Sequence, residues 1–174
     1  MARGCGLRDV RGAPARMIRY PVGGSGEVVS FADGVLDHFA RHRQTRFWHS
    51  EAGGLLFARL RAGVVSIEAV TGPRRSDRRS RCSYAGDRTS EQGEIDVHHA
   101  AGLHYVGDWH THPEDRPSPS GRDLLTMASR VTESGHSLTG FLFVIVGRAP
   151  APDGLAVLVH DGVAAHQLAP AVNG

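Results

Sequence analysis

The chain has 174 residues, of which 20 are arginine and none is lysine, set against 18 acidic residues and 11 histidines. With a formal net charge of +2, 40% hydrophobic residues and 22% charged residues, the composition excludes collagen-like, coiled-coil and wholly disordered chains. The length favours one domain that is large enough to bury a real core. The small net charge argues against nucleic acid as the main partner.

The cysteines and the N-terminal segment bear on the compartment. Cys5 and Cys82 are too few for a disulfide scaffold and lack CxxC spacing, which favours a reducing cytosol. Residues 1–16 are rich in Gly, Arg and Pro without periodicity, so they predict a flexible basic arm. No segment has the apolar length of a signal-peptide core or a membrane span. We therefore expect a cytoplasmic protein with no membrane partner.

The first half of the chain predicts one helix and four strands. The helix begins at Asp33, which can cap it, and ends near Arg43. Its apolar side chains at helical spacing are Val35, Leu36 and Phe39. The strands are short apolar runs bounded by Gly-containing turns, at 17–20, 27–31, 53–60 and 64–70. The last two are separated by three residues, as in a β-hairpin.

The second half alternates strands and helices after a long polar segment. Residues 71–90 contain six arginines and no hydrophobic period, which predicts a mobile Arg-rich loop. The elements expected after it are a helix capped by Ser90 at 91–101, a strand at 104–112, a helix at 118–132, a strand at 141–146 and a hairpin at 155–160 and 163–168. This order predicts a single mixed α/β domain over 17–169, followed by a tail at 170–174.

The segment from Gly107 to Asp123 carries the most specific chemical signal. His110 and His112 are two residues apart in a predicted strand, so their imidazoles share one face and can hold one metal ion. A proline-rich turn leads to a helix that starts near Ser120, with Asp123 in its first turn as a possible third ligand. Two histidines, one carboxylate and an open fourth position are typical of a catalytic zinc site.

Each part also has an ordinary structural interpretation. A pair of strand histidines is more often without metal, and Ser120 with Asp123 also fits a capping box. A zinc-bound water needs a base, and Glu51 precedes an apolar strand, although a Glu there is commonly a solvent-facing residue. Gly53 and Gly54 next to it allow a close backbone approach. The combination of these features at these offsets favours the metal site.

Glu51-Ala-Gly-Gly-Leu-Leu-Phe-Ala, followed by His110-Thr-His112 and by Ser120 and Asp123, resembles the JAMM (MPN-plus) metalloproteases, and most closely their bacterial branch in antiphage and mobile-element operons. The resemblance spans about 31–146. It implies an MPN/JAB-type domain with a mixed, curved β-sheet flanked by helices.

The resemblance also implies roles for these residues. One Zn2+ per chain would be held by His110, His112 and Asp123, with Glu51 as general acid/base and Ser120 supporting the oxyanion. The implied activity is cleavage of an isopeptide or peptide bond after the C-terminus of a ubiquitin-like protein, or of a similarly conjugated bacterial protein such as a CBASS nucleotide cyclase. The implied partners are the activating and conjugating enzymes of the same operon.

Further residues are assigned roles with alternatives left open. The arginines of the polar segment dock a substrate tail or an acidic patch, or form a solvated surface: Arg74, Arg75, Arg78, Arg79 and Arg81. Asp108 shares the strand face of the histidines and either orients one of them or is a surface residue. The aromatic pair Phe47 and Trp48 is expected in the core or at its rim.

Three other functions compete with the isopeptidase. A related hydrolase would trim the C-terminus of a sulfur-carrier protein. A metal-free MPN-type scaffold would lack the ligands that this chain retains. Nucleic-acid binding through the Arg-rich segment would show a steep dependence on salt. The absence of lysine would itself protect an enzyme that works beside a conjugation system, unless lysine is depleted throughout the genome.

Overall fold

The computed structural model describes residues 17–133 and 140–171. The helices are α1 (Asp33–His42), α2 (Arg88–Ala100) and α3 (Gly121–Glu133). The strands are β1 (Ile18–Pro21), β2 (Val28–Phe31), β3 (Gly53–Arg61), β4 (Val64–Val70), β5 (Arg78–Ser80), β6 (Ser83–Ala85), β7 (His104–Thr111), β8 (Phe141–Val146), β9 (Leu155–His160) and β10 (Ala165–Leu168). The basic arm at 1–16 and the last residues of the expected tail, 172–174, lie outside the described residues. None of the three helices is long and apolar enough to span a bilayer.

Eight strands form one mixed sheet in the order β1-β2-β4-β3-β7-β8-β9-β10. The pairs β2–β4 and β7–β8 are parallel, and α3 provides the crossover between β7 and β8. The two ends of this order approach each other, because the Ala171 N–H, just after β10, donates to the Arg19 carbonyl of β1 at 2.7 Å. The expected α/β domain with a curved mixed sheet is confirmed.

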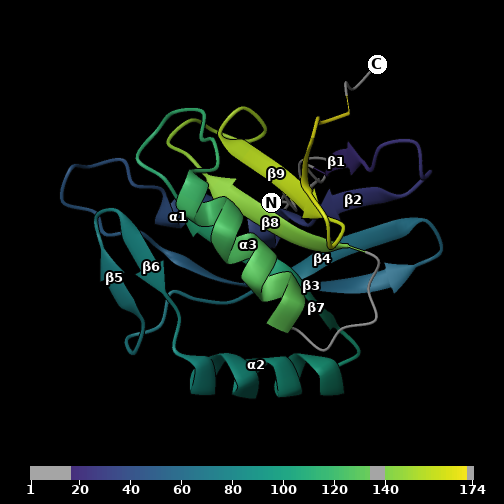
Figure 1. Ribbon diagram of the computed structural model, residues 1–174, viewed down its shortest axis with the longest axis horizontal. Helices are drawn as coiled ribbons and strands as arrows, with labels where there is room; N and C mark the ends of the chain where they lie inside the picture. The colour runs from purple at the N-terminus through teal and green to yellow at the C-terminus, as the bar shows by residue number, and fades with distance from the viewer. Residues whose placement is uncertain (1–16, 134–139, 172–174) are drawn as a thin grey trace, which may run out of the picture.

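The helices cover the two faces of this sheet, with α1 behind it and α3 in front (Figure 1). Strand β8 is apolar and buried throughout, and its side chains alternate between the two faces. Leu142, Val144 and Val146 join the core on the α1 side, which also buries Val35 and Phe39 of α1. Burial of each such side chain stabilises the fold by roughly 1.5–3 kcal/mol.

The aromatic side chains of β8 pack on the opposite face. Phe141 and Phe143 join Met127 of α3 in a second core cluster. Helix α2 packs against β7 and β3, where the His98 ring stacks on Phe57 with centroids 3.9 Å apart. Helix α2 therefore packs on β7, the strand that carries His110 and ends directly before His112, while α3 packs over β8 and β9.

The caps predicted for the first two helices are wrong, by one residue and by three residues. Helix α1 follows Ala32, which forms no side-chain cap, and Asp33 lies in the first turn, where its charge favours the helix dipole. Helix α2 begins before Ser90, because the Asp87 side chain accepts a hydrogen bond from the Ser90 N–H at 2.8 Å. The shift places Glu91 within α2, where it is buried.

The segment expected as a loop at 71–90 contains regular structure. Strands β5 and β6 pair as a small hairpin, and the segment ends in the first turn of α2. Backbone contacts attach it to the main sheet: a Cβ on Gly54 would lie 1.9 Å from the Thr71 carbonyl oxygen. The close approach expected at the glycine pair is thus present, and it holds the start of this segment on β3.

Candidate active site

Two histidines and one aspartate converge where β7 ends and α3 begins. The Nε2 atoms of His110 and His112 are 3.2 Å apart. The Asp123 carboxylate contacts both rings, with Oδ1 3.3 Å from His110 Nε2 and Oδ2 3.3 Å from His112 Nε2. The three side chains are 14–17% exposed. The structure therefore brings together the three residues that the sequence singled out as ligands.

Asp123 is held in place by the start of its own helix. The Ser120 N–H donates to Asp123 Oδ2 at 2.7 Å, and the Asp123 N–H donates to Ser120 Oγ at 3.2 Å. This is the reciprocal arrangement of a capping box. Burial alone would raise the pKa of Asp123, but hydrogen bonds from His110, His112 and Ser120 hold that pKa well below its usual range. The capping box is therefore present, and the ionised carboxylate that forms it also faces the two imidazoles.

The spacing of these atoms fits a metal ion. A tetrahedral zinc with bonds of about 2.0–2.1 Å places its ligand atoms about 3.3–3.4 Å apart. The 3.2 Å between the two Nε2 atoms matches that edge length, and each Nε2 is 3.3 Å from one of the two Asp123 oxygens. Two Nε2 atoms that face each other at this distance cannot both carry a proton, so at least one directs a lone pair into the cluster. The donor set can therefore hold a metal ion.

Glu51 lies beside the three side chains but farther from them than they are from one another. Its Oε1 is 4.0 Å from His112 Nε2, and its side chain is only 9% exposed. The ligand atoms of Glu51, His110 and His112 all lie within 4.8 Å of one another. Burial raises the pKa of the Glu51 carboxyl, although the two imidazoles partly oppose that rise. A carboxylate whose pKa is shifted toward neutrality is suited to move a proton to and from a neighbouring water.

A buried glutamine that the sequence did not indicate links the base to the histidine strand. The Ala52 N–H donates to Thr111 Oγ1 at 3.0 Å, and the Thr111 hydroxyl donates to Gln44 Oε1 at 3.0 Å. Gln44 Nε2 in turn donates to the carbonyls of His49, at 3.2 Å, and Arg81, at 3.0 Å. Thr111 lies between the two histidines, and Ala52 directly follows Glu51. This network therefore fixes the position of Glu51 relative to the two histidines. Only the strand alternation of Thr111 signalled a buried hydroxyl.

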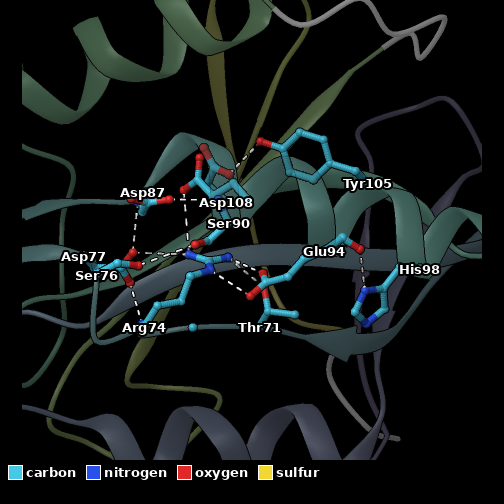
Figure 2. Close-up of polar contacts among 12 residues, drawn as sticks. Thr71, Arg74, Ser76, Asp77, Asp87, Ser90, Glu94, His98, Tyr105 and Asp108 are labelled. Atoms are coloured by element: carbon cyan, nitrogen blue, oxygen red, sulfur yellow. Dashed lines mark hydrogen bonds and ion pairs between the residues drawn. The ribbon is translucent and has the colours of Figure 1, made fainter.

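The predicted substrate arginines divide into two groups. Arg75, Arg78, Arg79 and Arg81 are exposed, whereas the Arg74 side chain is only 10% exposed. Figure 2 shows its guanidinium between the carboxylates of Asp77 and Glu94. A docking role for Arg74 is therefore wrong, because its charge is already balanced within the protein.

Arg74 belongs to a larger set of buried charges, which we call the arginine–carboxylate cluster. Its members are Arg74, Asp77, Glu91, Glu94, Asp108 and Arg130. Arg130 of α3 is 3.0 Å from Asp108 and 3.2 Å from Glu91. Asp108 also accepts a hydrogen bond from the Tyr105 hydroxyl at 2.7 Å. The expected contact between Asp108 and a histidine is wrong: its partners are Tyr105 of β7 and Arg130 of α3, so it joins β7 to α3 instead.

The segment between α1 and the base exposes aromatic side chains. Phe47 is 72% exposed and Trp48 is 60% exposed, so their expected place in the core or its rim is wrong. The Arg46 guanidinium lies 5.2 Å from the Trp48 ring centroid. This segment ends at Ser50, directly before Glu51, and therefore borders the site.

Comparisons with known proteins agree with this geometry. Residues 32–158 match the profile of the prokaryotic homologs of the JAB domain. A Pseudomonas aeruginosa protein named CD-NTase/cGAS isopeptidase is 33% identical over 134 residues, which cover 70% of this chain and 78% of that protein. A probable metalloprotease, y4qB, from Sinorhizobium fredii is 35% identical over 95 residues, covering 50% of this chain and 58% of that protein.

A solved structure extends the comparison to the fold. The solution structure of protein DSY2949 from Desulfitobacterium hafniense superimposes with a TM-score of 0.58 at 18% identity, over 79% of this chain and 87% of that one. At this identity the likeness concerns the fold alone. Taken with the profile match and the sequence relatives, it shows that the chain belongs to the prokaryotic JAB-domain family and is a hydrolase of the JAMM type.

Proposed function

We propose that this chain is a zinc-dependent isopeptidase. The residues to which we assign roles are His110, His112 and Asp123 as ligands of one zinc ion, Glu51 as the proton carrier and Ser120 as an oxyanion donor. The observation that carries the proposal is the convergence of two imidazole Nε2 atoms 3.2 Å apart, each 3.3 Å from one oxygen of Asp123, with the buried Glu51 carboxylate 4.0 Å from His112 Nε2. A carboxylate at that distance is within reach of a water that a bound metal ion would hold.

The side chains divide the chemistry of amide hydrolysis. Bound zinc would supply Lewis acidity, polarising the scissile carbonyl and lowering the pKa of a water toward about 7. The Glu51 carboxylate accepts the proton of the attacking water and then donates it to the departing amine. Ser120 Oγ already accepts the Asp123 N–H, so the hydroxyl hydrogen is available to the oxygen that gains negative charge.

The substrate class is inferred from the named relative. We propose that the chain cleaves the isopeptide bond that joins the C-terminus of a CD-NTase, or of a ubiquitin-like protein, to an amine of another molecule. Such a bond requires activating and conjugating enzymes, which would be its cytoplasmic partners. The isopeptidase would reverse the conjugation that these enzymes perform and release the modifying protein with a free C-terminus.

The decisive test is cleavage of a defined conjugate. The C-terminal peptide of a CD-NTase is joined through its carboxyl to the Nε amine of a lysine reporter and incubated with the zinc-loaded chain. We expect one cut, mapped by mass to the bond after the last CD-NTase residue, and no cut by the Glu51→Gln variant. The same peptide in a linear fusion distinguishes isopeptide from peptide preference.

Two results would contradict the proposal. Equal turnover by the Glu51→Gln variant would remove Glu51 as the proton carrier. Processing of a sulfur-carrier fusion in place of every conjugate would favour the C-terminal trimming enzyme instead.

A further inference from the structure

A hollow of about 370 Å³ lies next to the base and has a distinct composition. Its lining residues are Arg41, His42, Arg43, Trp48, His49, Ser50 and Arg79. Five of the seven are arginine or histidine, and none is a carboxylate. We call this feature the basic hollow.

Direct contacts connect the basic hollow to Glu51. Ser50 lines it and precedes Glu51, so their Cα atoms are about 3.8 Å apart. The Arg79 guanidinium donates to the Glu51 carbonyl at 2.6 Å and to the Ser50 carbonyl at 3.4 Å. A group bound in the hollow would therefore lie beside the backbone that carries Glu51.

The positive charges of the basic hollow are not balanced within the described residues. The Arg43 guanidinium donates to the carbonyls of Ala40 and Arg148, and that of Arg79 donates only to carbonyls. Arg41 is exposed, and its guanidinium forms no ion pair with a carboxylate of residues 17–133 or 140–171. These arginines differ from Arg74, whose charge is balanced by neighbouring carboxylates.

The shape and extent of this charge favour an acidic peptide over a nucleic acid. A nucleic-acid surface needs a stripe of cations that follows several phosphates. Here three guanidinium groups line one open hollow, and the exposed Trp48 ring supplies an apolar wall for a side-chain stem. Guanidinium groups bind carboxylates in paired, directional hydrogen bonds. The feature fits one or two acidic side chains.

We propose that the basic hollow binds acidic side chains of the substrate polypeptide close to the bond that is cleaved. The inference rests on the proposed isopeptidase function, which it deepens by naming the chemistry of the preferred sequence. Arg41 and Arg43 select the carboxylates, and Trp48 contacts the chain that carries them.

The test measures binding without turnover. Two fluorescein-labelled peptides are titrated with the full-length, zinc-loaded Glu51→Gln chain. One peptide contains Glu and Asp, and the other has Gln and Asn at the same positions. By fluorescence anisotropy, we expect the acidic peptide to bind at least about fivefold more tightly at low salt, because each uncompensated arginine adds a favourable ion pair. This preference should shrink as salt rises from about 0.01 M to about 0.15 M.

Variants locate the effect. Arg41→Gln should weaken the acidic peptide by about fivefold and leave the amide peptide unchanged. Arg61→Gln removes the same charge from another exposed arginine at the far end of β3, about 30 Å from the base, and should change neither. Equal binding of the two peptides, or equal losses in both variants, would overturn the inference.

Two further outcomes separate this inference from others. A single-stranded oligonucleotide that binds more tightly than the acidic peptide, and loses that affinity in Arg41→Gln, would overturn it in favour of nucleic acid. If the unmodified chain cleaves conjugates but shows no preference for acidic peptides, the proposed role of the hollow is refuted and the proposed isopeptidase function is not. An acidic preference in a chain that cleaves no conjugate refutes the proposed function and leaves the hollow standing.

Discussion

Two groups of buried carboxylates in this molecule differ in what balances their charge. In the arginine–carboxylate cluster, Arg74 and Arg130 lie among the acidic side chains and form ion pairs with them. At the proposed active site, the carboxylates of Glu51 and Asp123 face imidazoles instead. The first group supplies its own cations and is complete. The second has ligand atoms directed at one another, which is what a metal ion from solution requires.

The largest expected difference between the two groups follows from replacing one of the proposed zinc ligands. We expect His110→Ala to retain less than about one-tenth of the bound zinc and to lose turnover, because even residues that only orient zinc ligands change affinity by about 10–100-fold. Elemental analysis of the purified chain measures the zinc, and circular dichroism checks the fold. Stoichiometric zinc in this variant would mean that the ion is held elsewhere.

Removal of the base should leave the metal in place. Glu51→Gln keeps the shape of the side chain but cannot accept a proton, so turnover should fall by about 100- to 10,000-fold. Zinc content and unfolding midpoint should match those of the unmodified chain. In the unmodified chain, the burial that raises the pKa of Glu51 predicts that turnover falls on acidification at a higher pH than for an ordinary glutamate. A loss of zinc in Glu51→Gln would instead make Glu51 a ligand.

Breaking the arginine–carboxylate cluster should affect stability first. Arg130→Met removes the ion-pair partner of the buried Asp108 and leaves Glu91 with only the more distant Arg74, 3.9 Å away, so the free energy of unfolding should fall by about 3–5 kcal/mol. Urea titration measures it. The matched control is Arg116→Met, whose partner Asp153 is 68% exposed, and its cost should stay below about 1 kcal/mol. Equal costs would show that the buried cluster is no more than a surface-like ion pair.

The smallest expected effect concerns a histidine outside both groups. Burial, with the nearby His42 charge, lowers the pKa of His38 to about 4, and its Nε2 is 2.8 Å from the Gly72 carbonyl. The unfolded chain binds this proton at about pH 6.5 and the folded chain only near pH 4. Stability from this group is therefore present above pH 6.5 and is lost as the pH falls toward 4. His38→Gln should flatten the change in unfolding midpoint across that window; an unchanged slope would contradict it.

The parts that the sequence could predict are those written in local patterns. Histidines at alternate strand positions, and an aspartate three residues after a serine at a helix start, define their own relative geometry. Gln44 and Thr111 are 67 residues apart, and Arg130 and Glu91 are 39 apart. Such pairs form only once strands and helices pack, so neither the buried glutamine nor the cluster could be inferred from spacing.

The polar segment at 71–90 also shows that contacts between distant residues cannot be inferred from the sequence. Its composition resembles that of a solvated loop, but Arg74 has carboxylate partners outside the segment as well as inside it. Arg74 pairs with Glu94 of α2, 20 residues away. Charge that seems unpaired along the chain can therefore be fully paired in space, and only the folded arrangement distinguishes Arg74 from the exposed arginines around it.

The link from Gln44 through Thr111 to Ala52 has a consequence for handling the protein. All of its hydrogen bonds join backbone and uncharged side chains, and none involves a ligand atom. The framework that aligns the base with the two histidines is therefore independent of the ion that they would hold. A chelator should switch such a catalyst off without denaturing it, and added zinc should restore it on mixing, with no slow refolding phase. The enzyme could then persist as a dormant, correctly assembled scaffold wherever metal is scarce.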